Sequence, residues 1–301
     1  MAKTPSSRLF KLIKSMTGSE KRYFKLFIKR DVDSKYVQLF DAIEVQEEFN
    51  EDELIQIVYD GEKVQTRKYS ELKAYLYDLI IRSLQQYDEK NAVDYQLKNS
   101  LMSVRSLYRR SLFTDCHYLL KRARKTAFKY ERYSSLLEVL DWQKRIAYAM
   151  ADIDFIDQHL NELKEEETAC LAQIANLKVY QELFYELYVL VSKNTMRGEE
   201  QAERVGHLAN HSLLEKEQCA LSHTAKVYFY SIHALLSYYH RDTHQFYIFS
   251  RDLIQLLESN PALLREDVSH YIAGLSNAAV SCGYLKKHDE VRAYLSKLRK
   301  V

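Results

Sequence analysis

The chain has 301 residues, of which 47% are hydrophobic and 29% are charged, and its formal net charge at pH 7 is only +2. This composition excludes a disordered chain, and the near-neutral balance favours no particular class of partner. Only 6 Gly and 2 Pro occur in the whole length, too few for the tight turns that a β-rich fold needs. We therefore expect an all-α protein.

Residues 1–90 are expected to form an N-terminal helical unit. The runs Thr17–Glu20 and Asn50–Glu53 both have the spacing of a helix N-cap followed by an acid three residues later, each ahead of an apolar segment. A longer, strongly apolar helix is expected at about residues 65–87. The run Ser19–Phe24 also resembles the start of some uncharacterised bacterial helical-repeat proteins, which implies no activity.

Residues 91–301 carry a repeat. Helix-breaking turns recur at nearly even spacing, first after 41 residues and then after 45 residues three times, at Ser111, Asp152, Arg197, Asp242 and Lys287. Each turn separates two amphipathic patterns, which predicts ten helices arranged as about five hairpins. No single hairpin can bury its own apolar face, so we expect the hairpins to stack into a solenoid, that is, an α-α superhelix.

One hairpin, residues 104–123, has a more specific pattern. An aromatic precedes a small turn residue, a second aromatic follows it, and small residues stand where the two helices touch: Tyr108, Ser111, Phe113, Cys116, Leu120 and Ala123. This spacing resembles the tetratricopeptide repeat. The resemblance covers residues 93–301, although the middle hairpins fit less closely because their period near 45 exceeds the family's 34. It implies a superhelix whose groove binds a protein or peptide.

The charge is unevenly distributed along the chain. Residues 1–30 contain nine Lys or Arg and one Glu, and residues 105–132 contain nine Lys or Arg and two acids. The second stretch is either a solvated face paired with acidic neighbours or a site for an acidic peptide or a nucleic-acid backbone. The candidate acidic neighbours lie further along the chain, at Glu162, Glu165, Glu166 and Glu167.

The candidate partner-binding residues come from two arguments. The tetratricopeptide resemblance implies that four side chains of the first repeat helix project into the groove: Lys98, Arg105, Tyr108 and Arg109. The paired Asn residues with which some family members clamp carboxylate-rich peptides are missing. The chain also has 24 Tyr, most of which should be packing residues. Because rigid amphipathic rings are favoured in interfaces, we expect groove anchors at Tyr228, Tyr238 and Tyr239.

No pattern predicts chemistry. The glycines are scattered singly, no nucleophile has a local base, and the pair His207 and His211 lacks a third metal ligand. The four Cys have no CxxC spacing and are expected as small buried residues in a reducing compartment. We therefore expect no enzyme, no cofactor and no metal. Without a signal peptide or a long apolar stretch, the protein is expected to be cytoplasmic and not to bind a membrane.

The leading interpretation is a non-enzymatic protein–protein interaction scaffold that binds a protein or peptide, preferably an acidic one, in the solenoid groove. One alternative is a nucleic-acid-binding or transcription-regulatory protein that uses the basic N-terminal unit, with residues 51–87 read as helix-turn-helix. Another is a structural subunit that associates through the C-terminal stripe Val291, Leu295, Leu298 and Val301. The oligomeric state and the identity of the partner stay open.

Overall fold

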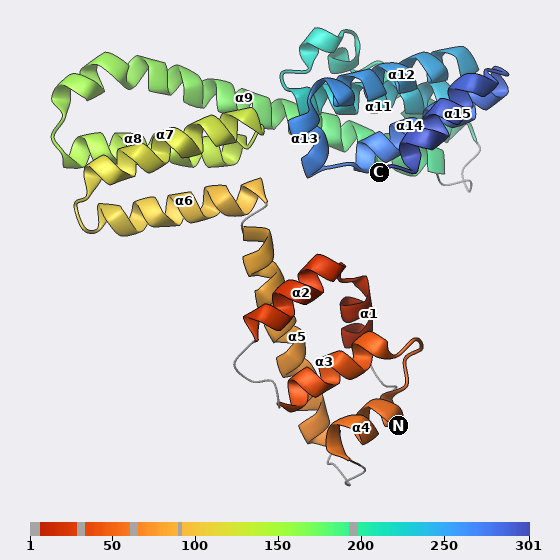
Figure 1. The fold of residues 1–301 in the computed structure, drawn as a ribbon. Helices are drawn as coiled ribbons and strands as arrows, with labels where there is room; N and C mark the ends of the chain where they lie inside the picture. The colour runs from red at the N-terminus through yellow and green to blue at the C-terminus, as the bar shows by residue number, and fades with distance from the viewer. Residues whose placement is uncertain (1–6, 29–33, 61–65, 90–91, 193–197) are drawn as a thin grey trace. The chain divides into compact units, whose positions relative to one another are not determined.

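The computed structural model describes residues 7–28, 34–60, 66–89, 92–192 and 198–301. Within these ranges every regular element is helical (Figure 1), so the predicted all-α class is confirmed. The chain divides into two compact units, Met1–Gln96 and Leu97–Val301. No helix in the described ranges is both long and apolar enough to cross a membrane.

The first unit contains the helices α1 (Arg8–Ser15), α2 (Gly18–Phe27), α3 (Lys35–Val45), α4 (Glu51–Tyr59) and α5 (Thr66–Glu89). The predicted N-caps are present, because the Thr17 hydroxyl accepts the Glu20 N–H and the Asn50 side chain accepts the Glu53 N–H. Helix α5 packs on α2 and α3, and Phe24 of α2 is fully buried with its ring 4.6 Å from that of Phe40. Burial of such rings supplies most of the stability of a unit of this size.

Helix α6 (Val93–Tyr108) begins in the first unit and continues into the second. It is followed by two further helices of similar length and then by a much longer one: α7 (Phe113–Lys129), α8 (Tyr133–Ala149) and α9 (Ile153–Ser192). The second half contains α10 (Glu199–Ala209), two 3-10 turns at Ser212–Leu214 and Glu217–Cys219, α11 (His223–Tyr239), α12 (Thr243–Ser259), α13 (Pro261–Glu266), α14 (Ser269–Tyr284) and α15 (His288–Leu298).

The ends of α6, α7, α8, α11 and α14 share one corner geometry. Each has a non-glycine residue with a left-handed φ between 52° and 59°, namely Ser111, Glu131, Ala151, Arg241 and Lys286. After α6 the Ser111 N–H donates to the Tyr108 carbonyl, and the Leu112 N–H donates to the Leu107 carbonyl. The same two bonds recur at the other four corners, which is the Schellman termination of a helix. Four of the five predicted turn positions fall at such a corner or one residue after it, and Arg197 lies outside the described residues.

The prediction of five equal hairpins is wrong in the middle of the second unit. Helix α9 is continuous over 40 residues, where two separate helices were expected. The segment between Leu163 and Leu190 contains no Gly and no Pro, so nothing in it favours a break over continued helix. The helix packs against α8 and, further along the chain, against α10 and α11. An extra short helix, α13, starts at Pro261, which stands in the N1 position that proline favours.

The helices α11, α12, α14 and α15 pack in succession. Leu275 and Ala278 of α14 are fully buried against Leu253 of α12. Gly274 lets these two helices approach closely, since a Cβ there would lie 3.3 Å from the Leu253 Cδ2 and 3.4 Å from the Ile254 Cγ1. This dense packing gives the surface grooves of the unit a rigid base.

Candidate binding grooves and charged surfaces

A groove of about 440 Å³ lies between α6 and α8, and we call it the α6/α8 groove. It is lined by Lys98, Leu101, Met102 and Arg105 of α6 and by Glu138, Asp141, Trp142 and Arg145 of α8. Two of the predicted binding residues, Lys98 and Arg105, therefore share one cavity. They are seven residues apart, which is two helical turns, so they lie one above the other on the same face of α6.

The α6/α8 groove has uneven charge pairing. On the α8 side, the Arg145 guanidinium is 2.8 Å from the Asp141 carboxylate and 5.3 Å from the centre of the Trp142 ring. On the α6 side, Lys98 and Arg105 are exposed, and neither has an ion-pair partner among the described residues. Lys98 and Arg105 of α6 can therefore bind an anionic ligand, whereas Arg145 of α8 is already paired with Asp141.

The other two residues predicted from the first repeat helix have different positions. Tyr108 is half-buried, with its ring centre 5.7 Å from that of Phe113 and 5.3 Å from that of Trp142. It packs edge-on against the tryptophan that lines the α6/α8 groove, which makes it a packing residue behind the groove. Arg109 is exposed and is not part of the groove lining.

A second groove, of about 890 Å³, lies where the ends of several helices of the second half meet. The rings of Tyr238, Tyr239, Phe246 and Tyr284 contribute to its lining, together with Val191, Gly198, Glu199, Gln201, Ala202, Ser237, Arg241, Asp242 and Thr243. Two predicted anchors, Tyr238 and Tyr239, therefore lie together in one cavity, and Tyr238 is 54% exposed. Its ring centre is 5.5 Å from that of the buried Phe246, which holds it in place.

The third predicted tyrosine anchor, Tyr228, is not a surface residue. It is only 6% exposed, and its ring centre lies 5.4 Å from that of Phe184 and 4.8 Å from that of His270. Burial, followed by a hydrogen bond with Tyr185, raises the pKa of Tyr228 to about 12. The expectation that Tyr228 lines a groove is therefore corrected, because α11 turns this ring into the core.

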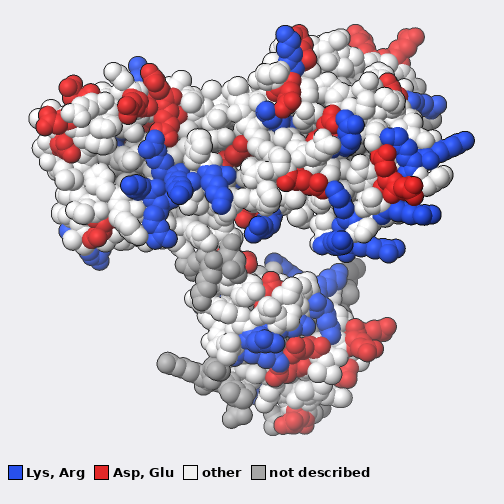
Figure 2. Space-filling view, turned by 45° about the horizontal axis from the view of Figure 1, so that its top comes forward, with Lys and Arg blue, Asp and Glu red and all other residues white. Residues whose placement is uncertain are grey.

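The basic stretch at residues 105–132 is on the surface. Eight of its nine cations are exposed, and Arg132 is half-buried. One predicted acidic neighbour does pair with it, since the Arg124 Nη2 is 2.5 Å from the Glu166 Oε2. Figure 2 shows blue clusters of Lys and Arg beside red clusters of Asp and Glu on the part of the second unit that holds α6–α9. The paired interpretation holds for Arg124 and, through Glu266, for Arg132, while Lys121, Arg122, Lys125 and Lys129 have no acidic partner in the described residues.

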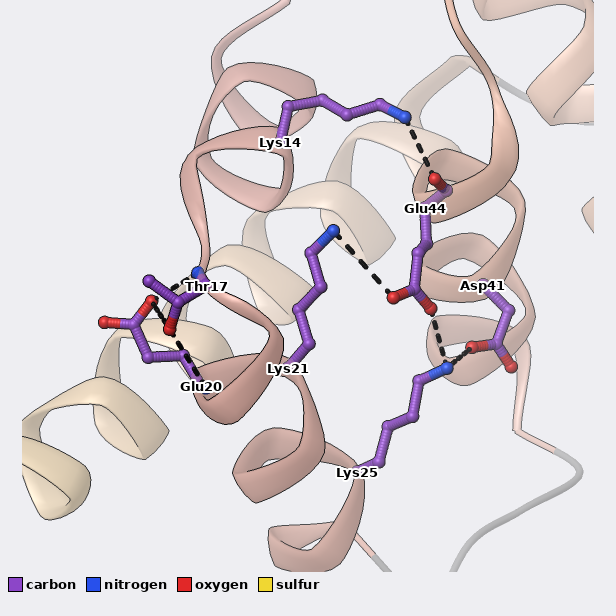
Figure 3. A network of polar contacts seen from close by, with 7 residues as sticks. All are labelled: Lys14, Thr17, Glu20, Lys21, Lys25, Asp41 and Glu44. Carbon is purple, nitrogen blue, oxygen red and sulfur yellow. Dashed lines mark hydrogen bonds and ion pairs between the residues drawn. The ribbon is translucent and has the colours of Figure 1, made fainter. Parts of the chain in front are cut away.

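Part of the basic surplus of residues 1–30 is paired inside the first unit (Figure 3). The Lys25 Nζ is 2.9 Å from Asp41 and 2.7 Å from Glu44, and the Lys21 Nζ is 3.8 Å from Glu44. The Lys14 Nζ donates to the Glu44 carbonyl at 2.9 Å. These contacts tie α1 and α2 to α3, and they pair two of the cations of α2, Lys21 and Lys25, with carboxylates.

The helix-turn-helix interpretation of residues 51–87 gains no support from the geometry. Of the two cations at the start of the expected recognition helix, Arg67 is paired with Glu71 and Lys68 is exposed, and further along Lys73 is paired with Glu51. Tyr69 is 3% exposed, and burial raises its pKa. Of these side chains, Tyr69, Arg67 and Lys73 are held within the unit and offer little to a DNA groove.

His211 and Asp152 have structural roles. The His211 side chain accepts the Leu213 N–H at 3.2 Å, and the Asp152 carboxylate accepts the Phe155 N–H at 3.1 Å. The four cysteines are free, and Cys116, Cys170 and Cys282 are buried. Among the described residues, no group of three or more His, Cys, Asp or Glu side chains has the arrangement of a metal site.

Sequence reasoning missed the α8 side of the α6/α8 groove. Trp142, Arg145 and Glu138 line it from the first helix of the next hairpin. The tetratricopeptide resemblance contains a signal that could have found them, because in a stack of hairpins the first helices of neighbouring repeats lie side by side. Trp142 is also the single tryptophan of the chain.

In comparisons with known proteins, no family model, curated protein or solved structure matches this chain. The resemblance to the tetratricopeptide repeat therefore rests on the hairpin at residues 104–123. Function is inferred from the grooves and charged surfaces alone.

Proposed function

We propose that the protein is a non-enzymatic, cytoplasmic interaction scaffold that binds an acidic peptide segment of a partner protein in the α6/α8 groove. The observation that carries this proposal is the pair Lys98 and Arg105, which are exposed and form no ion pair with any described residue, on one wall of a cavity whose other wall holds Trp142. Two cations beside an indole ring can bind a ligand that has carboxylates and apolar side chains.

The architecture behind this proposal is a tetratricopeptide-like α-α superhelix. Repeated use of one corner geometry and the succession of packed antiparallel neighbours support it. In such a stack the first helix of each hairpin lines a continuous groove, and α6 and α8 are those helices here. The long helix α9 then links the early hairpins to the later ones.

The binding step would be recognition of a helix or strand in a groove. Lys98 and Arg105, spaced by two turns, would contact two carboxylates of the ligand, and Met102, 68% exposed between them on α6, would contact its apolar side chains. Partly exposed charged contacts of this kind contribute about 1 kcal/mol each. The expected affinity is therefore moderate and falls with salt.

The test uses the single tryptophan as a reporter. Peptides selected from a random library on the full chain are titrated into the protein while the fluorescence of Trp142 is followed. The proposal predicts that selected peptides are rich in Asp and Glu and that they change the Trp142 emission saturably. Selected peptides without an acidic bias, or acidic binders that leave the Trp142 emission unchanged, would overturn the groove assignment.

Fewer residues are exposed for self-association through the C-terminal stripe than the sequence suggested. Of the C-terminal stripe, Leu298 packs on the α12/α14 core and Val291 is half-buried, while Leu295 is 45% and Val301 is 53% exposed. Two exposed side chains form a small patch compared with the area that a stable dimer buries. We therefore favour the groove over self-association through α15.

A further inference from the structure

The outward side of α7 carries a set of residues that the α6/α8 groove does not use. They are Tyr118, Lys121, Arg122, Lys125, Phe128 and Lys129, and we call them the α7 outer face. At about 100° per residue, these six positions fall within an arc of roughly 120° of the helix. The arc is opposite the buried stripe of α7, which consists of Cys116, Leu120, Ala123 and Ala127.

The cations of this face are free of acids. Lys121, Arg122, Lys125 and Lys129 are exposed, and none has an acidic partner among the described residues. Arg124, on the flank of the arc, shows the contrast because it is paired with Glu166. Four unpaired cations on three turns of one helix concentrate positive potential, which favours a polyanion.

Two aromatic rings stand among these cations. Tyr118 is 63% exposed and Phe128 is 68% exposed, so both rings are largely in water. The Arg122 guanidinium lies 5.8 Å from the centre of the Tyr118 ring, and no acid competes for it in the described residues. Exposed rings such as these offer flat apolar faces on which the planar groups of a ligand can stack.

The combination of rings and cations distinguishes between polyanions. An acidic peptide uses the cations but has no planar groups to stack on the two rings, whereas a single-stranded nucleic acid uses both, with phosphates on the cations and bases on the rings. A duplex keeps its bases stacked internally and offers the rings nothing. From Tyr118 to Lys129 the face extends roughly 16 Å along the helix at 1.5 Å per residue, enough for a short single-stranded segment.

We propose that the α7 outer face binds single-stranded nucleic acid without sequence preference. This second activity is independent of peptide binding in the α6/α8 groove, which uses other residues. It also differs from nucleic-acid binding through the N-terminal unit, where Lys21 and Lys25 are paired with Asp41 and Glu44.

The test is fluorescence anisotropy of a labelled oligothymidylate with the full chain between about 50 and 200 mM salt. The proposal predicts binding whose log K falls with log salt at a slope of about −3, from four released counterions. The quadruple variant K121Q/R122Q/K125Q/K129Q should lose at least tenfold in affinity and most of the salt slope. The double variant Y118A/F128A should lose roughly tenfold while it keeps the slope, because stacking is not ionic.

A matched control is the variant K68Q/K164Q/K216Q/K300Q, which removes four exposed Lys that form no ion pair with the described residues and changes the net charge equally. It should bind within twofold of the unchanged chain. All substituted side chains are exposed, and unchanged thermal unfolding verifies the fold. Three results would overturn the proposal: no binding at about 50 mM salt, equal losses in the control, or a polyglutamate peptide that binds the same face as tightly and is as sensitive to Y118A/F128A.

Discussion

The Glu131 carboxylate, at the corner between α7 and α8, binds the N-terminus of α11 through Thr224, which is 93 residues further along the chain. It accepts the Thr224 N–H at 2.9 Å, the Thr224 hydroxyl at 2.6 Å and the His223 N–H at 2.6 Å. The next residue, Arg132, lies 3.5 Å from Glu266 at the end of α13. The corner between α7 and α8 therefore contacts both the start of α11 and the end of α13.

This relationship predicts a large effect for Glu131→Ala. The carboxylate satisfies two N–H groups at a helix N-terminus and interacts favourably with the helix dipole, so its loss should lower the free energy of unfolding by about 2 kcal/mol. Glu131→Gln keeps one acceptor oxygen and should lose about half as much. Urea unfolding of the unchanged chain and the two variants measures these losses. A loss below about 0.5 kcal/mol for Glu131→Ala would show that the hydrogen bonds between Glu131 and α11 contribute little to stability.

The corner geometry predicts a stabilising substitution. Ala151 has φ 52°, and a non-glycine residue pays for this left-handed conformation while its methyl group gains little there. Ala151→Gly should therefore raise the free energy of unfolding by about 0.5 kcal/mol. The control Ala172→Gly, at an exposed position inside α9, should lower it by about 1 kcal/mol. If both glycines destabilised the protein equally, the left-handed corner at Ala151 would be contradicted.

The histidines of the second half predict a pH dependence of stability. Burial lowers the pKa of His223, His233 and His270 below the ordinary value of 6.5. The unfolded chain therefore binds protons more readily, and stability is complete above about pH 6.5 and is lost as the pH falls towards the folded-state pKa values. Each histidine contributes a slope of at most about 1.4 kcal/mol per pH unit.

Thermal unfolding from pH 7.5 down to pH 5.5 measures this slope. The variant His270→Asn removes one titrating group from the ring cluster with Phe184 and Tyr228, and it should unfold with a shallower pH dependence. A stability that stays flat over this interval in the unchanged chain would contradict the burial of these histidines.

The sequence was sufficient for the local features of the fold. Turn residues and apolar spacing located four of the hairpin corners, and the caps at Thr17 and Asn50 were readable because their partners are three residues away. These predictions succeed because local hydrogen bonds and helical periodicity decide them.

The remaining features depend on contacts between distant segments. The continuity of α9 could not be read, since an amphipathic stretch without Gly or Pro allows both one helix and two. The burial of Tyr228 and the exposure of Tyr238 depend on how α11 is rotated against its neighbours. The bond between Glu131 and Thr224 joins residues whose proximity only the packed helices create.

Calorimetric titration of an acidic peptide into charge-reversal variants tests most directly whether Lys98 and Arg105 recognise such a peptide in the α6/α8 groove. The double variant Lys98→Glu/Arg105→Glu should weaken binding by roughly thirtyfold, because two contacts of about 1 kcal/mol each are lost. The control Arg109→Glu, exposed but outside the groove lining, should change the affinity by less than about threefold. Equal weakening by both variants, or unchanged affinity in the double variant with intact thermal unfolding, would contradict the assignment of the groove.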